Sequence, residues 1–510
     1  MNATIRQRLT GRKRSIAARL QRKPQVDGPA PVFNASSIHY EIGERQRGIV
    51  YGGIGLFLQL AQQTGLVSAI DERLQLLKCH APYFESDHVL NIAFNALCDG
   101  RCLQDIELRR NDEAFLDALG ADRIPDPTTA GDFCRRFASG HLQSLHEAID
   151  QARRTVWARQ PQAFFDRATL DFDGTLVPTD GEKKQGVEIA YDGTWGYHPL
   201  ICTFAETGEV LRIINRSGNR PSHEGAAEQA DQLTALCRAA GFRRIVLRGD
   251  TDFSQTAHLD RWDAEGAEFV FGYDAHPNLI LQADILPKSA WKRLVRPPRH
   301  EVQTQPRRKR DNVKQQIVED RLFEELRLES EDVAEFAYRP TACKKTYRMI
   351  VVRKNLAVHV AQQRLFPEER YFFYISNFAH GSATSGEVVF EANDRCRQEN
   401  LIEQLHNGCR ALRAGLDTLE ANAACMTMTA LAWNLKAWAA LWLPEQNGRW
   451  KEQHQAQKRS LLRIEFRTFI NTFVRLPCQI IRSGRRLIYR LLGWNPYLPV
   501  FFRLAHVLRC

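Results

Sequence analysis

The spacing of apolar residues changes character along the chain, beginning with a helical pattern. Between about residues 52 and 159 apolar positions recur at helical spacing, for example at Val89, Ile92, Ala93, Ala96 and Leu97. Ser86 is positioned to cap that helix and Gly100 to end it. A second helix is expected at residues 126–137, with Pro127 at its entrance. The pattern predicts an all-helical N-terminal domain over residues 46–160.

The next segment is rich in strand-forming runs joined by short turns that contain glycine. Residues 167–177, 196–206 and 209–218 predict three consecutive strands. A helix (222–240), a strand (243–250), a second helix (254–266) and a further strand (267–273) are then expected. The order β-β-β-α-β-α-β predicts an α/β core of the RNase H-like type over residues 161–280, with helices flanking a mixed sheet.

Helical periodicity is weak over residues 281–366, where basic and strand-like runs such as "YRMIVVRKN" predict a β-rich insertion. A buried strand at 369–378, a helix at 393–409 and an apolar helix after Ala421 predict the second part of the core, over residues 367–445. Residues 446–510 are expected to form a basic helical C-terminal region. Residues 1–45 resemble a mobile basic arm followed by a linker that contains proline.

Two features bear on the compartment of the protein. The most hydrophobic window runs from Met426 to Pro444, but Asn434 and Lys436 lie near its middle. A buried helix is therefore expected there rather than a membrane span, and no membrane association is predicted. The 12 cysteines include no CxxC pair and the chain has no recognisable signal peptide, which favours the reducing cytoplasm.

The net charge of +10 is concentrated in three regions. The N-terminal arm contains eight basic residues before any acidic one, residues 288–314 contain ten, and the stretch from Lys458 onward contains eleven against Glu465 alone. Three separate basic regions favour binding to the phosphate backbone of DNA, with acidic membrane lipid as the alternative for the terminal arms. The candidate phosphate-binding residues here are Arg12, Lys13, Arg14, Arg307, Arg308, Lys309 and Arg310.

The sequence "DFDGTLV" at residues 171–177 has the form of the nucleophile motif of haloacid-dehalogenase-like phosphohydrolases. In that alternative Asp171 would be the nucleophile. The motif should then feed a helix or cap, whereas here it feeds two more strands. The later magnesium motif is also incomplete, because Ser and Gln follow at positions 254 and 255.

A second hypothesis uses three carboxylates that bind two magnesium ions. Asp173 on the first strand, Asp250 at the end of the fourth strand and Glu399 on a later helix occur in the required order. Arg395 and His406 lie four residues before and seven after Glu399, which places them on one face of a regular helix as candidate phosphate-binding groups. Asp171 and Asp252 each lie two residues from a proposed ligand, so either can replace its neighbour in this scheme.

These residues resemble the catalytic motifs of bacterial insertion-sequence transposases of the DDE type, DDE domain group 1. That group has a β-rich insertion between the second Asp and the Glu, and a helix motif Tyr-x2-Arg-x3-Glu-x6-Lys. Arg395 and Glu399 match the motif, whereas Ala392 and His406 stand where Tyr and Lys are usual. "DFDGT" and "RGDTDF" resemble the first and second aspartate sites, and select Asp173 and Asp250.

The resemblance implies a transposase that binds the terminal inverted repeats of its element, cleaves the ends and joins 3′-hydroxyls to target DNA. It implies two Mg²⁺ ions, with Mn²⁺ as a substitute, held by Asp173, Asp250 and Glu399. A homodimer in the DNA complex and a location in the cytoplasm with the nucleoid are expected. A DNA-binding remnant without activity stays open as an alternative, because Ala392 and His406 depart from the motif.

Overall fold

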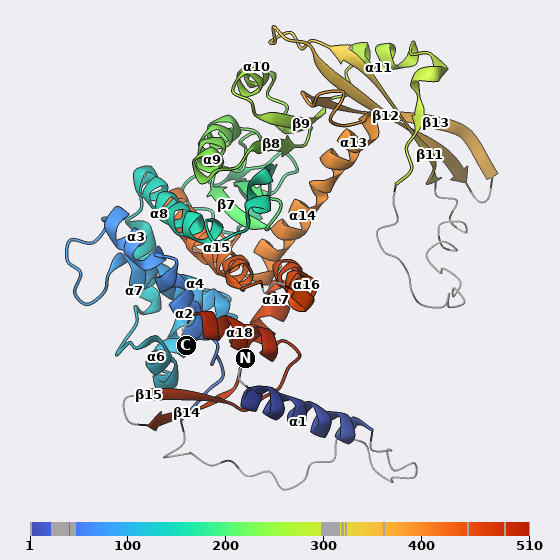
Figure 1. Cartoon of the computed structure of the whole chain (residues 1–510). Coiled ribbons are helices and arrows are strands. Elements are labelled where there is room, and N and C mark those ends of the chain that lie inside the picture. The colour runs from blue at the N-terminus through green and yellow to red at the C-terminus, as the bar shows by residue number, and fades with distance from the viewer. Residues whose placement is uncertain are drawn as a thin grey trace.

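The structure is a computed structural model that describes residues 3–21, 40, 47–296, 317, 321, 324–360, 363–445, 448–483 and 486–508. Its architecture is mixed α/β, as the sequence predicts, with a nine-stranded sheet and helices around it (Figure 1). Helices predominate before and after the sheet. None of the described helices is long and apolar enough to cross a membrane.

The N-terminal part is helical between residues 54 and 157, as predicted. Its elements are α2 (Ile54–Gln63), α3 (Leu66–Arg73), α4 (Glu85–Leu97), η1 (Leu103–Asp105), α5 (Ile106–Arg110), α6 (Glu113–Leu119), α7 (Pro127–Arg135) and α8 (Ser139–Trp157). α7 begins at Pro127, where Asp126 accepts the N–H of Thr129 at 2.9 Å. α4 begins one residue before the expected cap, so Ser86 lies within its first turn and bonds to Asp71 instead.

The core strands have the order β7-β6-β2-β8-β9 within the large sheet. β2 pairs antiparallel with β6 and parallel with β8, β6 pairs antiparallel with β7, and β8 pairs parallel with β9. These strands are β2 (Arg167–Gly174), β6 (Leu200–Phe204), β7 (Glu209–Ile214), β8 (Arg244–Gly249) and β9 (Glu268–Tyr273). The helices α9 (Ala226–Ala240) and α10 (Thr256–Ala264) connect them, and η2 (Gln162–Asp166) precedes β2.

A small second sheet lies beside the end of β2. It has the order β3-β5-β4 and is formed by β3 (Val177–Pro178), β4 (Glu188–Ile189) and β5 (Trp195–Tyr197). Gly196 of β5 is needed for close packing, because a Cβ at this position would lie 2.3 Å from the carbonyl oxygen of Val177. The expected strand at 196–206 is therefore divided between two sheets.

The insertion continues the large sheet instead of forming a separate one. β11 (Glu324–Tyr338), β12 (Tyr347–Val360) and β13 (Gln363–Ser376) form an antiparallel meander, and β13 also pairs with β9 through Phe373–Ser376. β10 (Lys292–Arg293) lies at the edge, after α11 (Pro277–Asp284) and η4 (Lys288–Ala290). The meander extends away from the core helices (Figure 1). The strand predicted at 369–378 is thus the last strand of the insertion and joins it to the core.

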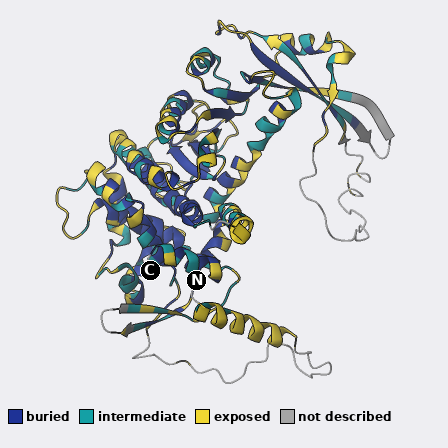
Figure 2. Ribbon diagram, viewed as in Figure 1, coloured by how far each residue is buried: buried dark blue, intermediate teal, exposed yellow. Residues whose placement is uncertain are grey.

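The predicted apolar helix after Ala421 is α15 (Leu419–Trp442), which is buried along nearly its whole length (Figure 2). Its polar residues have buried partners. Asn434 accepts the N–H of Val210 at 2.9 Å and donates to the carbonyl of Val210 at 2.8 Å, so its side chain completes the edge of β7. Lys436 donates to the carbonyl of Leu462 at 2.9 Å. These bonds explain why a helix in the protein core contains the two residues that argue against a membrane span.

The two ends of the chain contain elements that were not predicted from the sequence. Residues 3–20, within the expected basic arm, form the helix α1 (Ala3–Leu20), because Ala, Leu, Arg and Gln favour a helix even though every residue of α1 is exposed or half-exposed. The C-terminal region is only partly helical. Its strands β14 (Cys478–Ser483) and β15 (Arg486–Leu491) pair with β1 (Arg47–Ile49). Burial alternates along both strands: Cys478 and Ile480 are buried in β14, and Leu487, Tyr489 and Leu491 are less exposed than Ile488 and Arg490 in β15. This period of two is that of a strand with one face against the core.

The remaining C-terminal elements pack between this small sheet and α15. They are η6 (Gly448–Trp450), α16 (Lys451–Arg463), α17 (Phe466–Phe469), the π-helix η7 (Ile470–Val474) and α18 (Leu498–Val507). Phe57 of α2 meets Phe469 of α17 edge-on at 5.5 Å between ring centroids. The N-terminal and C-terminal regions therefore share one apolar core. All the cysteines in the described part of the chain are free thiols.

A buried histidine gives the helical region a specific pH dependence. His88 of α4 is 3% exposed and stacks on the ring of Phe133 at 4.3 Å. Burial lowers the pKa of His88 to about 4. Because the unfolded chain binds this proton more tightly, stability present above the unfolded pKa of about 6.5 is lost as the pH falls toward 4.

We therefore expect wild type to lose on the order of 3 kcal/mol more unfolding free energy than His88→Phe between about pH 7 and pH 4. Phenylalanine preserves the ring packing and removes the titration. Urea unfolding at a series of pH values measures the difference. Parallel stability profiles for the two proteins would contradict this account of His88.

Candidate active site

The two strand-end aspartates come together because β2 and β8 are parallel neighbours. Asp171 of β2 is in register with Arg248 of β8, so Asp173 and Asp250 lie two residues further toward the same end of the sheet. Asp250 caps the short helix η3 (Thr251–Phe253), where its carboxylate accepts the N–H of Asp252 at 3.0 Å. Gly249 allows this tight turn, because a Cβ there would lie 2.5 Å from the Cβ of Phe253.

Arg395 joins the three predicted carboxylates. Its Nη1 donates to Oδ2 of Asp173 at 2.8 Å, and its Nη2 lies 3.6 Å from Oε1 of Glu399. Burial opposes the charge of the guanidinium, but Asp173, Asp250 and Glu399 outweigh it and raise the pKa of Arg395. The structure thus brings Asp173, Asp250, Glu399 and Arg395 into one electrostatic cluster.

The single arginine does not fully compensate the aspartates. Burial raises the pKa of Asp173 to about 6, with Arg395 opposing the shift and the charge of Asp250 adding to it. Burial also raises the pKa of Asp250, where Arg395 opposes the shift and Asp252 adds to it. The mutual repulsion and desolvation of two such carboxylates favour binding of additional positive charge.

The donor chemistry of the cluster fits a divalent cation, since Mg²⁺ and Mn²⁺ prefer carboxylate oxygens. In the structure the carboxylates are paired with Arg395. Within the described residues no three acidic, histidine or cysteine side chains are close enough together to hold a metal ion. The side chain of Glu399 is 59% exposed and is directed to Arg395. The space between these carboxylates, which Arg395 now occupies, is therefore the place where an added cation would be most favoured.

Asp171 and Asp252 are held differently from the three carboxylates of this cluster. Asp171 is 1% exposed, and both of its carboxylate oxygens accept hydrogen bonds from Arg248, at 2.6 and 2.9 Å. Asp252 is exposed at the surface of η3, and it contributes a backbone N–H to Asp250. The buried ion pair leaves Asp171 without a free oxygen directed at the cluster, which also argues against the phosphohydrolase alternative, in which Asp171 is the nucleophile.

A buried polar network lies directly beneath the carboxylate cluster. Arg248 bonds to Asp171 and also donates to the carboxylate and carbonyl oxygens of Glu391, at 2.8 and 2.9 Å. Gln398, next to Glu399, donates to the carbonyls of Asp171 and Ile201, both at 3.1 Å. We call Asp171, Arg248, Glu391 and Gln398 the support network. Each of its members lies one to eight residues before a predicted metal ligand, and together they fix two strands and the acidic helix.

Arg248, Glu391 and Gln398 were not predicted from the sequence as part of the site. The available signal was an arginine that directly follows the apolar run Ile245–Leu247, since a buried charge in such a position requires a buried partner. Asp274, which follows β9, was also missed. It contributes to the raised pKa of Asp250 and lies at the same end of the parallel strands.

The predicted helix over residues 393–409 is divided. α13 (Ser385–Asp394) ends before Arg395, α14 (Cys396–Glu403) carries Glu399, and a π-helix, η5 (Gln404–Gly408), carries His406. The α-helical spacing used to place His406 beside Glu399 does not apply across a π-turn. Instead, Nε2 of His406 lies 3.0 Å from Oγ1 of Thr175, just after β2. Burial lowers the pKa of His406, Glu403 opposes the shift and Arg413 adds to it, which favours a neutral imidazole.

Ala392, which replaces the tyrosine of the motif, lies in a cavity of about 370 Å³ beside Asp250 and Arg395. Tyrosines from the neighbouring strands line the same cavity: Tyr273, Tyr371 and Tyr374. The phenol groups of these three tyrosines thus lie in the space next to Ala392, which lacks the phenol of the motif.

The predicted basic residues lie elsewhere or outside the described residues. Arg12 is on the exposed helix α1 and donates to the carbonyls of Leu491 and Gly493, at 3.1 and 2.9 Å. Lys13 and Arg14 are exposed on the same helix, at the end of the molecule remote from β8 and α14 (Figure 1). The cluster Arg307, Arg308, Lys309 and Arg310 lies outside the residues that the structure describes.

The mixed sheet, the aspartates at adjoining strand ends and the glutamate on a following helix have the layout of a transposase catalytic domain. The chain belongs to this class: the family Transposase DDE domain group 1 matches it over residues 50–510. Proteins of the DDE type generally act with divalent metal ions, so the family agrees with the chemistry of the cluster.

Among solved structures, the piggyBac transposase synaptic complex with hairpin DNA is similar to this chain, with a TM-score of 0.33 and 10% sequence identity. The similarity covers 84% of each chain. A comparison with curated proteins gives no match.

Proposed function

We propose that this protein is the transposase of a bacterial insertion sequence. In this function it binds the terminal inverted repeats of its element, cleaves the ends and joins the 3′-hydroxyls to target DNA. The observation that supports the proposal best is the convergence of Asp173 and Asp250, linked through Arg395 to Glu399, in a chain of the DDE family.

Asp173, Asp250 and Glu399 are the proposed ligands of two Mg²⁺ ions, for which Mn²⁺ can substitute. Such ions activate the attacking oxygen and stabilise the leaving one in phosphoryl transfer. The protein's own contribution is the placement of the carboxylates on two parallel strands and one helix, over the support network. Arg395 partly neutralises these carboxylates in the present arrangement, and with cations bound there it would be available to a DNA phosphate.

The role proposed for His406 is that of a neutral hydrogen-bonding group. Its position against Thr175 and its lowered pKa favour donation from a ring N–H over a permanent positive charge. A lysine at this position, as in the family motif, would carry its charge throughout the physiological range. Histidine in place of lysine at position 406 is therefore expected to weaken, but not to abolish, binding to phosphate.

The proposed partners are the terminal repeats and target DNA, bound by a homodimer that pairs two ends. The basic residues Arg12, Lys13 and Arg14, together with Arg307, Arg308, Lys309 and Arg310, are proposed phosphate contacts away from the carboxylate cluster. We propose a location in the cytoplasm with the nucleoid, where the free thiols would stay reduced. Light scattering on the DNA complex tests for two protein copies.

The function is tested with the DNA that flanks the coding region. We expect the purified protein to cleave a duplex that contains the terminal inverted repeat when Mg²⁺ or Mn²⁺ is present, and to leave a scrambled duplex intact. Binding without cleavage in either metal would instead establish the inactive remnant. Metal-dependent hydrolysis of p-nitrophenyl phosphate without any action on DNA would support the phosphohydrolase.

A further inference from the structure

A cavity with several arginines lies next to the carboxylate cluster and is not explained by the roles assigned above. Its volume is about 750 Å³, within the range of roughly 300–1,000 Å³ that is typical of ligand sites. One wall comes from the helical region, at α4, η1 and α7, and the other from residues 406–416, which follow α14. The cavity therefore lies between the helical region and the core.

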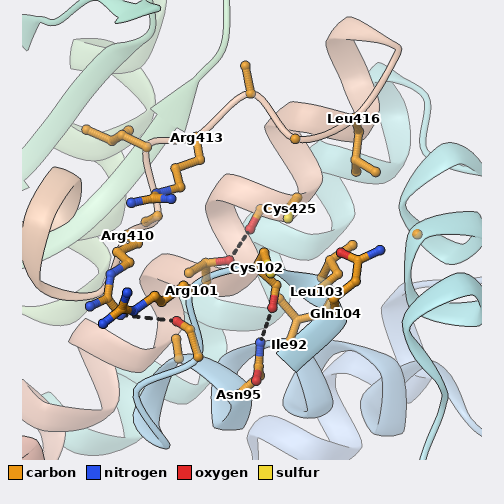
Figure 3. Close-up of a pocket in the computed structure, with 18 of the residues that line it drawn as sticks. Ile92, Asn95, Arg101, Cys102, Leu103, Gln104, Arg410, Arg413, Leu416 and Cys425 are labelled. Carbon is orange, nitrogen blue, oxygen red and sulfur yellow. Dashed lines mark hydrogen bonds between the residues drawn. The ribbon is translucent and has the colours of Figure 1, made fainter. Parts of the chain in front are cut away.

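Four arginines line this cavity, and one of them, Arg135, forms ion pairs with Asp132 and Asp417. Arg410 and Arg413 lie on one side together with Arg101, while Leu103 and Leu416 lie on the opposite side (Figure 3). Arg101 and Arg413 are exposed, and neither forms an ion pair with an acidic side chain in the part of the chain that the structure describes. We call Arg101, Arg410 and Arg413 the arginine cluster.

The backbone holds Arg410 in an unusual conformation. Arg410 has φ +57° and Asp99, across the cavity wall, has φ +63°; among the described residues these are the two non-glycine positions with positive φ. Nη1 of Arg410 lies 3.0 Å from Oδ1 of Asp99 and 3.4 Å from the carbonyl of Gly100. A left-handed backbone at two contacting residues costs conformational energy, of the kind that proteins retain at functional sites. The pair holds one face of the Arg410 guanidinium and fixes its orientation.

The cavity extends to His406, which contacts the residue that follows β2. His406 lines the cavity, and its Nε2 lies 3.0 Å from Oγ1 of Thr175, two residues after Asp173. Arg413 is close enough to contribute to the lowered pKa of His406. A polyanion that extends from the carboxylates past His406 would therefore reach the arginine cluster.

We propose that this cavity binds the backbone of an unpaired DNA strand adjacent to the reacting phosphodiester, with the arginine cluster as its phosphate ligands. The proposal rests on the proposed function. Guanidinium groups bind phosphate through paired N–H donors, and the apolar side of the cavity suits the sugar. The volume admits a short single-stranded segment but not a duplex. No Phe, Tyr or Trp of the described residues lines the cavity, and His406 contacts Thr175, so the contact reads the backbone and not the bases.

The test measures binding of a labelled duplex with a short single-stranded overhang, and of the same duplex with blunt ends, in EDTA so that no cleavage occurs. The variant is Arg101→Gln combined with Arg413→Gln, because both side chains are exposed and their loss should not affect folding. The matched control is Arg154→Gln combined with Arg243→Gln, two exposed arginines outside the cavity.

We expect the cavity variant to bind the overhang duplex about 10-fold more weakly than the control variant does. The slope of the logarithm of its binding constant against the logarithm of the salt concentration should become shallower by about 0.7 for each lost contact with single-stranded DNA. The two variants should bind the blunt duplex alike. Equal binding of the overhang duplex by both variants would overturn the proposal, as would an equal loss on both duplexes, which would indicate a general basic surface.

Two further results separate this proposal from the proposed function. If wild type cleaves terminal repeats with Mg²⁺ but the cavity variant binds the overhang duplex like the control, only the cavity proposal fails. If wild type binds no DNA at all, both fail. Calorimetry with inorganic phosphate alone provides the last arm: binding as tight as that of the overhang would assign the cavity to a free anion and overturn the proposal.

Discussion

Asp173→Asn is expected to reduce DNA cleavage by at least about 10³-fold while leaving DNA binding within about twofold of wild type. The carboxylate is a proposed metal ligand, and the charge stabilisation that a bound metal provides amounts to several kcal/mol of the activation barrier. Asparagine has nearly the same shape but lacks the negative charge. Asp250→Asn and Glu399→Gln should have the same consequence, because the three carboxylates act on the same ions.

The measurement is cleavage of a terminal-repeat duplex in Mg²⁺, combined with binding in EDTA. Asp252→Asn is the matched control, since Asp252 is exposed two residues from Asp250 and contributes only its backbone N–H. That variant should retain activity within about 10-fold, because substitution at Asp252 removes only one neighbouring charge. Mn²⁺ binding followed by electron paramagnetic resonance should weaken in Asp173→Asn and not in Asp252→Asn. Full cleavage by Asp173→Asn would refute the assignment.

Arg248→Met is expected to lower the free energy of unfolding by about 3–5 kcal/mol, because it leaves a buried carboxylate without its partner. Arg248 has 2% of its side chain exposed and holds both oxygens of Asp171, together with the carboxylate and carbonyl of Glu391. Burial already raises the pKa of Asp171 despite this pairing. Without Arg248 the carboxyl group must either remain charged in an apolar environment or bind a proton on folding.

Urea unfolding at neutral pH measures this loss. Arg244→Met is the matched control on the same strand, because its ion pair with Glu268 lies at the surface with side-chain exposures of 50% and 29%. An exposed pair of this kind contributes up to about 1 kcal/mol. A loss below about 1 kcal/mol in Arg248→Met would show that the support network does not stabilise the fold.

The double variant Asp171→Asn with Arg248→Met separates stability from positioning. Removing both charges should recover part of the lost stability, since no buried charge remains unpaired. Cleavage should not recover, because the link from Arg248 to Glu391 on α13 is still absent. Gln398→Leu should likewise reduce the rate of cleavage more than the affinity for DNA, because Gln398 ties the helix of Glu399 to β2 and β6 without reaching the surface.

The order and type of the core elements could be predicted from the sequence because each apolar run matched one period. β2, β8 and α15 were identified within a few residues for this reason. The pairing of β13 with β9 was less accessible, since it depends on contacts between segments about 100 residues apart. The hairpin at residues 478–491 was missed because neither CQIIRS nor RLIYRL shows a clear polar and apolar alternation, and the alternation appears only in the burial of the paired strands.

The candidate site was only partly predictable. Asp171 and Asp173 lie on the same face of β2, so the choice between them depends on which one is in register with Arg248, and this pairing is not visible in either strand alone. The position of His406 depends on a π-turn, which changes the register of every later side chain without a clear signal in the sequence. Arg395 was identified as a phosphate-binding group, but its contact with Asp173 emerges only from the packed helix.

The pairing of β1 with β14 has a consequence for synthesis of the protein. Arg47 meets Ile480, a partner translated about 430 residues later, and Gly53 donates to the carbonyl of Val474 at 3.1 Å. The helical region therefore emerges from the ribosome early, but β1 and α2 are covered only after the last part of the chain has been synthesised. An mRNA that is truncated or frameshifted near its 3′ end would yield a chain in which β1 and the C-terminal side of α2 stay uncovered. Chaperones and proteases act on such exposed surfaces.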